Sequence, residues 1–355
     1  MSPATPRLQV QYKRTSDVDL HAASLSHWQQ RYEQTSAGAF QGEVQELLLT
    51  DNCDDGRGSN PGSGLQLFHE WANRATSQRC QLWEGGFWIG LSVAEKPHPG
   101  LRFMGRALEP QTLMTSPSGG EFALQVPAGC ALYGIVLPRH ALFGRPDFCD
   151  EGSALPANRA DCPQLWHLAP LARMRLVGLL REIFRNLDTG HCEAEQSLVS
   201  RMLHGAVCTV LRDVLHTQRC SATSAHGKTY ALPHRHRQRH CDTVARSCEW
   251  ALAHSAQAPG IEALCNALHI TPRTLQNSFQ EVLGISPAFY LRSLRLNQVR
   301  RALQEPPAVH GQLPAIADIA SQWGFWHLGH FGESYKALFG ETPSETRSRS
   351  LQGRF

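Results

Sequence analysis

The sequence has no run of about 18 consecutive apolar residues, so it predicts no transmembrane helix. Its first twenty residues, MSPATPRLQVQYKRTSDVDL, are polar and lack the apolar core of a secretory signal, which argues against export. The eleven cysteines are an odd number without a repeating interval, which favours reduced thiols over a disulfide framework. We therefore expect a cytoplasmic protein without a membrane partner.

Enzyme signatures are also missing. No P-loop, G-x-S-x-G or H-E-x-x-H motif occurs. A metal-binding enzyme of the cupin kind would need closely spaced histidines on strands, whereas His69, His98 and His140 are isolated. A second group alternates in a polar segment without a cysteine or acidic partner at fixed spacing: His234, His236 and His240. We expect no catalytic residue, no metal site and no permanently bound cofactor.

Composition and charge point to an ordinary folded protein with an uneven charge distribution. Apolar residues make up 41% of the chain, enough for buried cores, and 355 residues predict two domains or three small ones. Residues 1–226 carry 20 Lys+Arg and 22 Asp+Glu, a net of −2, whereas residues 227–355 carry 14 and 9, a net of +5. A basic C-terminal part suits a polyanion such as nucleic acid and equally suits a plain solvated surface.

The first half reads as β-rich. Short apolar runs separated by Gly, Pro and Asn occur at 41–51, 80–93, 101–108, 121–126 and 131–137. Phe122, Leu124 and Val126 alternate with polar neighbours, as in a half-buried strand. Residues 51–64 have the composition of a loop, and residues 1 to about 30 show little periodicity. Many short strands at this spacing predict a sandwich or barrel.

Two amphipathic helices are predicted next, over 163–187 and 195–216, because apolar residues recur there at steps of three and four. A short turn at Asp188–Gly190 would join them into a hairpin. The hairpin either covers the sheet only or also forms a dimer seam, and we favour the second, because four further apolar positions widen the stripe: Leu171, Val177, Leu180 and Val199. Residues 217–236 lack an apolar period and read as an interdomain linker.

The last third contains one pattern twice. LQNSFQEVLGISP (275–287) and FGESYKALFGETP (331–343) both read apolar-x-x-x-aromatic-x-x-x-apolar-Gly-x-Ser/Thr-Pro. In the first copy, Thr271 and Pro272 predict a helix start, Gly284 a helix stop, and Ser286 with Pro287 the next start. Each copy follows a short apolar helix and a turn, so the sequence predicts two helix-turn-helix units.

A helix-turn-helix places its second helix in the DNA major groove, about 12 Å wide. Two units joined by the helix predicted at 291–303 would enter successive grooves on one face of the duplex, roughly 34 Å apart. A helical solenoid is the alternative, but two copies are too few for one.

Geometry then selects the residues that we expect to contact DNA. Arginine bonds guanine bidentately, and glutamine or asparagine bonds adenine. On the outer face of the first unit these residues are Thr271, Arg273, Thr274, Gln276, Asn277 and Gln280. In the second unit they are His327, Leu328, Gly329, His330 and Glu333. For phosphate contacts we expect Lys336, Arg292 and Arg301, with Arg295 and Arg300 as further candidates.

The C-terminal ~100 residues resemble the DNA-binding domain of AraC-type transcription regulators. The residues that carry the resemblance are Leu264, Cys265, Leu275, Phe279, Gly284, Pro287, Arg295, Ile319, Ala320, Gly324, Phe325, Phe331, Tyr335, Gly340, Pro343 and Arg347. Departures include Cys265 in place of the usual alanine, His327 in place of a capping serine, and two glycines in the second recognition helix. Segments 27–47, 80–91, 264–287 and 322–344 further resemble the ethanolamine-operon regulator branch of that family.

The resemblance implies an α+β multidomain protein. Residues 1–160 would form a β-rich, cupin-like effector-sensing domain, 161–216 a dimerising helical hairpin, 217–236 the linker and 237–350 the tandem helix-turn-helix domain. It implies a homodimeric activator that binds double-stranded DNA, works with RNA polymerase, and responds to ethanolamine and adenosylcobalamin. Residues that could line an effector pocket are Trp28, Phe40, Glu43, Trp83, Phe87, Trp88 and Tyr133, with Glu46 as a second carboxylate.

Other readings stay open. An AraC-type regulator with a different small-molecule effector is the nearest alternative. A metal-dependent cupin-like enzyme is remote. A repair sensor that accepts an alkyl group on a cysteine is also remote, since such proteins can carry this DNA-binding domain; the acceptor would be Cys53, Cys80 or Cys130.

Overall fold

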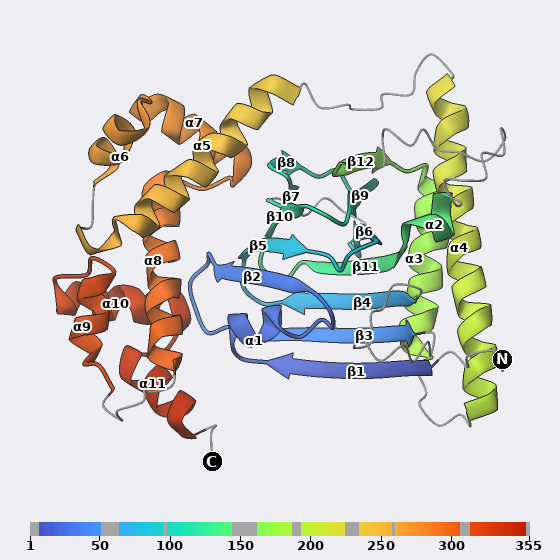
Figure 1. The fold of residues 1–355 in the computed structure, drawn as a ribbon, viewed down its shortest axis with the longest axis horizontal. Helices are drawn as coiled ribbons and strands as arrows, with labels where there is room; N and C mark the ends of the chain where they lie inside the picture. Colours follow the sequence, from blue (N-terminus) through green and yellow to red (C-terminus); the bar gives the residue numbers. More distant parts are fainter. Residues whose placement is uncertain are drawn as a thin grey trace.

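The computed structural model describes residues 7–50, 64–94, 98, 100–143, 162–186, 193–223, 234–257, 260–305 and 313–352. Figure 1 shows three parts side by side: a helical C-terminal domain, a β-domain, and a pair of helices on the far side of the β-domain. Within the described residues, no helix is long and apolar enough to cross a membrane.

The strands of the β-domain form two sheets. One has the order β1-β3-β4-β11-β6-β9-β12 and the other β2-β5-β10-β7-β8, within the described residues. Their bounds are β1 Arg7–Thr15, β2 Gln29–Gln34, β3 Gly42–Thr50, β4 Leu65–Ala72, β5 Thr76–Gln81, β6 Gly86–Ser92, β7 Arg102–Phe103, β8 Arg106–Ala107, β9 Thr112–Pro117, β10 Glu121–Val126, β11 Ala131–Pro138 and β12 Gln164–His167. Two short helices accompany them, α1 Val18–Ala22 and α2 Arg139–Phe143.

Each face of the larger sheet has its own hydrophobic core, because side chains alternate along a strand. On β11, Leu132 and Val136 face the smaller sheet, whereas Ile135 and Leu137 face the helical pair. That pair consists of α3 Pro170–Arg185 and α4 Glu193–Thr223. Gly90 and Gly134 are register partners on the inner face. A side chain at either position would collide with a large ring, Trp88 at Gly90 and Phe68 at Gly134, so glycine makes room for the aromatic core.

Two expectations about secondary structure were wrong. Residues 7–15 form a nine-residue strand that pairs with β3, although no element was expected there. The sequence contained a signal for this strand, because Leu8 and Val10 alternate with polar residues. In the structure both side chains pack against the core under α3 and α4. The helix expected from 163 begins only at Pro170, because proline suits the first helical position and the residue before it is extended. Residues 164–167 pair with β9 instead.

The linker and the hairpin turn were placed only approximately. Helix α4 continues to Thr223, beyond the expected start of the linker at 217. Helix α5 (His234–Ala253) begins before the expected end of the linker at 236. Residues 224–233 and the turn expected at Asp188–Gly190 lie outside the described residues, as does most of the loop expected at 51–64.

The helical domain contains the doubled pattern as two separate cores. The first unit comprises α5, η2 Ser255–Gln257, α6 Ile261–Leu268 and α7 Pro272–Val282. The second comprises α9 Ile316–Gln322, α10 Leu328–Phe339 and α11 Pro343–Gln352, and α8 Pro287–Gln304 runs between the two. Leu275 and Phe279 centre the first core, and Phe331 and Tyr335 the second. The expected helix-turn-helix pair is confirmed.

The expected caps are formed as well. The Thr271 side chain accepts a hydrogen bond from the Thr274 N–H at 3.1 Å, and Ser286 accepts one from Phe289 at 3.4 Å. Gly284 and Gly340 end α7 and α10 with the same positive φ of 74°, a conformation that glycine adopts without steric cost.

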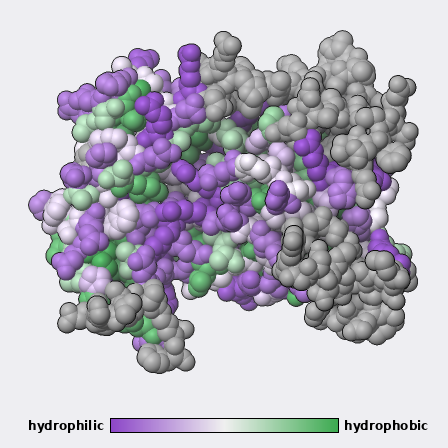
Figure 2. All heavy atoms as spheres, viewed as in Figure 1, coloured by the Kyte–Doolittle hydropathy of each residue, from purple (hydrophilic) through white to green (hydrophobic). Residues whose placement is uncertain are grey.

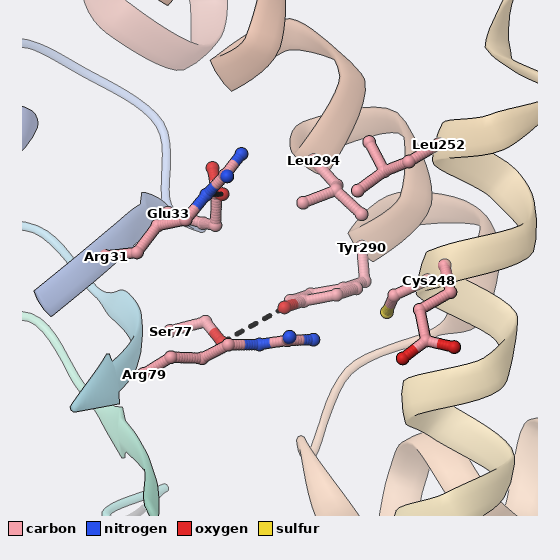
Figure 3. Close-up of a pocket in the computed structure, with 9 residues that line it drawn as sticks. Arg31, Glu33, Ser77, Arg79, Cys248, Leu252, Tyr290 and Leu294 are labelled. Atoms are coloured by element: carbon pink, nitrogen blue, oxygen red, sulfur yellow. Dashed lines mark hydrogen bonds and ion pairs between the residues drawn. The ribbon is translucent and has the colours of Figure 1, made fainter. Parts of the chain in front are cut away.

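Helix α8 also docks against the β-domain. The side-chain amide of Asn297 accepts from the Gln34 N–H and donates to the Gln34 carbonyl, each at 3.1 Å, as a neighbouring strand would. On β5, the strand that pairs with β2, the Ser77 hydroxyl oxygen lies 3.1 Å from that of Tyr290. Figure 3 shows Tyr290 pointing toward Ser77 across a small hollow, with Arg31 and Arg79 on the opposite wall from Cys248.

Two arginines of α8 form ion pairs across the same interface. Arg300 is almost fully buried; it lies 2.8 Å from Asp17 of the β-domain and 3.1 Å from Glu341 of the second unit. Arg301 lies 2.7 Å from Asp19 and 2.8 Å from Glu33. Burial is the largest single influence and lowers the pKa of Arg300, but the charge and hydrogen bond of Asp17, together with Tyr335 and Glu341, outweigh it and raise that pKa. The β-domain and the helical domain are therefore joined by buried charges.

Candidate nucleic-acid interface

Helix α7 divides cleanly into a buried and an exposed face. Leu275, Phe279 and Val282 are buried in the core of the first unit. The residues of this unit that we expected to contact DNA are all exposed: Thr271, Arg273, Thr274, Gln276, Asn277 and Gln280. Arg273 and Gln276 lie one turn apart, so their side chains project from the same side of the helix. This face offers a guanidinium and an amide to base edges.

Helix α10 of the second unit is arranged similarly but with fewer donors. Its expected contact residues are exposed: His327, Leu328, Gly329, His330, Glu333 and Lys336. A Cβ added at Gly329 or Gly332 would meet nothing within 4 Å, so packing among the described residues does not require glycine there. Trp326, 62% exposed at the start of α10, is a large side chain that sequence reasoning did not select. Trp326 directly follows the predicted turn Gly324-Phe325 of the second helix-turn-helix unit, and this position could have marked it as a surface residue.

The four arginines of α8 differ in whether their side chains can reach a phosphate. Arg292 is exposed and bonds the Ser334 hydroxyl of α10, so it remains open to a phosphate. Arg300 and Arg301 are not available to a phosphate, because both form ion pairs with the β-domain. Arg295 lies between the units, with its guanidinium carbon 5.2 Å from the centre of the Phe325 ring. A phosphate contact by Arg301 thus stays a prediction that requires its ion pairs to open.

The β-domain forms hydrogen bonds to α7 and α10 near their C-terminal ends. Arg102 Nη1 donates to the Glu281 carbonyl of α7 at 2.7 Å. Gly38 N–H donates to the carbonyls of Ala337 and Leu338 of α10 at 3.0 and 3.1 Å. These bonds satisfy carbonyls that a helix end leaves free, and the Arg102 cation suits the negative end of the α7 dipole. The N-terminal halves of both helices stay exposed. Figure 2 shows mostly hydrophilic side chains on the drawn face of the helical domain, with small hydrophobic areas among them.

The residues expected to line an effector pocket are not gathered in one place. Four of them lie in the core between the two sheets: Trp28, Phe40, Trp83 and Trp88. Phe87 and Tyr133 lie in the other core, under α3 and α4, because neighbouring residues of a strand face opposite sides. Glu43 is at the edge, 3.0 Å from Arg14. Glu46 is fully buried and accepts hydrogen bonds from the Ser26 N–H and hydroxyl at 3.0 and 2.9 Å.

The two described cysteines considered as alkyl acceptors are poor nucleophiles. Burial raises the pKa of the Cys80 thiol well above its usual range and that of Cys130 to about 11. Reactive cysteines have lowered pKa values and partial exposure, so neither residue favours a repair chemistry. Cys53 lies outside the described residues. Within the described part of the chain, no three His, Cys, Asp or Glu residues are grouped as metal ligands would be.

Comparison with known proteins agrees with the geometry of the helical domain. Residues 264–349 match the family model "Helix-turn-helix domain". The XylDLEGF operon transcriptional activator of Pseudomonas putida is 38% identical over 86 residues, 24% of this chain and 26% of that protein. The transcriptional activator RhaR of Pectobacterium carotovorum is 36% identical over 102 residues, 28% of this chain and 34% of that protein. The chain therefore spans only about a quarter to a third of these two relatives.

A solved AraC-type regulator from Chromobacterium violaceum aligns with 31% of this chain and 94% of its own, at 25% identity and a TM-score of 0.28. At that TM-score the alignment adds no argument, and the similarity rests on the family match and the sequence relatives. Residues 264–349 therefore form a helix-turn-helix domain that is similar in sequence to part of two transcriptional activators.

Proposed function

We propose that the protein is a sequence-specific DNA-binding transcription regulator, an activator that works with RNA polymerase. The observation that carries the proposal is the exposed face of α7, where Arg273 and Gln276 project from a helix whose opposite face is buried. Arginine and glutamine are the side chains that read guanine and adenine in the major groove. The second unit supplies α10 for the next groove, with Lys336 and Arg292 on its phosphates.

Selection of bound fragments from a pool of random duplex DNA by the full-length protein tests this function. We expect enrichment of sites with two conserved segments whose centres lie roughly one helical turn, about 34 Å, apart. Recovery of fragments without any shared sequence would contradict sequence-specific recognition. Both relatives named above are transcriptional activators by name, which supports the direction of regulation that we propose.

A homodimer is part of the proposal. The α3–α4 hairpin packs one side on the larger sheet and leaves apolar side chains exposed on another. Leu171 is 53% exposed, Met174 63% and Met202 66%. A second copy of the hairpin would remove these side chains from water.

We further propose, on the ethanolamine-operon resemblance of the sequence, that the β-domain senses ethanolamine together with adenosylcobalamin. Support comes from two buried carboxylates among aromatic side chains. Glu46 lies beside Gln66, which accepts a hydrogen bond from Trp28 Nε1 at 2.9 Å. Glu70 lies 3.0 Å from His21 and 3.3 Å from the Tyr32 hydroxyl. An ammonium group would find both a negative partner and aromatic faces in this interior.

Thermal unfolding tests the effector. Ethanolamine and adenosylcobalamin, added together at about 100 times their dissociation constants, should stabilise the folded protein by about 2.7 kcal/mol per saturated site and raise Tm by several degrees. Ethylene glycol, which lacks the ammonium group, should produce no shift, and neither should ethanolamine with the Glu46→Gln variant. An unchanged Tm for wild type with both compounds would reject this effector pair and leave the DNA-binding proposal intact.

A further inference from the structure

A hollow of about 230 Å³ lies within the helical domain, between α5, α6 and α8, away from the DNA-facing side of α7. Its lining includes Trp250, Ile261, Leu264, Ala288, Leu291 and Arg295. One water molecule needs only about 10–15 Å³, whereas pockets for drug-sized ligands measure roughly 300–1,000 Å³. The hollow is therefore the size for a small organic molecule of a few carbon atoms.

Arg295 is the one charged residue among those that line the hollow. Its Nη1 is buried and finds no hydrogen-bond acceptor among the described residues. Burial, and then the neighbouring charge of Arg292, lower the pKa of Arg295. Its contact with the Phe325 ring offsets only part of that cost, because a cation–π contact satisfies no N–H group. A partly buried cation whose Nη1 has no acceptor within the described part of the chain is unfavourable, and the other side chains that line the hollow are apolar.

We propose that this hollow binds a small apolar monocarboxylate. The carboxylate would pair with Arg295, in the charge-assisted geometry that guanidinium groups favour. The hydrocarbon part would pack on Trp250, Ile261 and Leu291. This site lies in a different domain from the aromatic core proposed for ethanolamine, and its chemistry is of the opposite charge.

Because the hollow lies where the two helix-turn-helix units meet, a bound ligand would change how the units are placed for DNA binding. This consequence rests on the proposed function. Trp250, Ile261 and Leu264 belong to the first unit, whereas Arg295 also touches Phe325, in the turn between α9 and α10 of the second. The same junction includes the Ser255 hydroxyl, which donates to the Gln322 carbonyl at 3.2 Å. Neutralising Arg295 would change the contact that connects the two units.

Calorimetric titration of the full-length protein with hexanoate and with hexan-1-ol tests the proposal without DNA. The two probes have the same carbon chain, so any difference comes from the carboxylate. We expect hexanoate to bind at least about tenfold more tightly than hexanol, and 2-bromohexanoate to quench part of the tryptophan fluorescence of wild type but not of Trp250→Phe. Equal affinities for the two probes, or quenching that persists in Trp250→Phe, would overturn the proposal.

Substitutions test whether Arg295 is the residue that binds the carboxylate. Arg295→Met should reduce hexanoate affinity to that of hexanol, while Arg246→Met, at an exposed position of α5, should leave both affinities unchanged. If Arg295→Met fails to fold, Ile261→Trp, which fills the hollow, serves instead and should abolish binding of both probes. Undiminished hexanoate binding in the folded variant would refute the site. If the DNA selection recovers no shared sequence while hexanoate still binds, the proposed function is rejected and the hexanoate site is not.

Discussion

Replacing Arg273 and Gln276 together by alanine should abolish the preference of the protein for its operator while the fold remains intact. Both side chains are exposed on α7, so their removal leaves no cavity and no buried group without a partner. Each lost bidentate base contact costs about 1–3 kcal/mol, so the two together should weaken specific binding by about 2–6 kcal/mol, at least about 30-fold. Gel-shift titrations with the selected site and with a scrambled duplex measure the effect.

The control is Arg246→Ala, which removes one positive charge from an exposed position of α5. Because a general charge acts on all sequences alike, this variant should weaken the operator and scrambled complexes equally and only slightly. Operator preference that survives the double substitution on α7 would place base recognition on another surface.

Asp17→Ala should produce the largest loss of stability among single substitutions at the domain interface. Asp17 and Arg300 are both almost fully buried and lie 2.8 Å apart. Removing one partner of a buried ion pair leaves the other charge uncompensated, which typically costs about 3–5 kcal/mol. Glu341, 3.1 Å from Arg300, remains as a partner, so we expect a loss near about 3 kcal/mol. Urea unfolding followed by circular dichroism measures it.

Glu182→Ala is the matched control for a carboxylate in an ion pair. Glu182 pairs with Arg185 on the same helix, and both side chains are more than 60% exposed. Exposed pairs of this kind contribute about 0.3–0.5 kcal/mol or less. If the two variants lose equal stability, the buried pair does not hold the domains together as we describe.

Acid provides a second test of the same pair. Burial would raise the pKa of Asp17, but the charge and hydrogen bond of Arg300 outweigh it, so the folded pKa lies below the ordinary 3.8. A carboxylate whose folded pKa is lowered stabilises the protein above its unfolded pKa, and this stabilisation disappears as pH falls through the folded value. Asp17→Ala should therefore lose the part of the acid sensitivity that lies below about pH 3.8.

The helix-turn-helix pair was predictable because its signals are local. Thr271 before Pro272 at the start of α7, and Gly284 and Gly340 after the two apolar steps, act within a few residues of chain. The two amphipathic faces then follow from spacing alone, which is why the exposed residues of α7 matched the sequence analysis position by position.

The roles of Arg300 and Arg301 were not predictable in this way. On α8 they look like other exposed helix arginines. Asp17 stands 283 residues before its partner Arg300, and Asp19 stands 282 residues before its partner Arg301. No spacing rule connects positions so far apart. Sequence reasoning therefore assigned to DNA two cations that the β-domain already neutralises.

The residues expected to line an effector pocket lie in two separate cores, and here the sequence contained the signal that separates them. Phe87 and Trp88 are consecutive, and consecutive residues of a strand face opposite sides of the sheet. They could not have lined one pocket together. Applying the two-residue period to each aromatic would have separated the two cores, whereas the close packing of Trp88 on Phe122, with ring centres 4.5 Å apart, depends on sheet pairing that no local pattern reveals.

Hydroxyl-radical footprinting of the full-length protein on a selected operator tests the central claim most directly. Two helices that enter successive major grooves should protect two short segments about one helical turn apart, on the same face of the duplex. In the Arg273→Ala, Gln276→Ala variant, the segment under the first unit should lose its protection. A single protected segment, or two segments on opposite faces, would contradict the account.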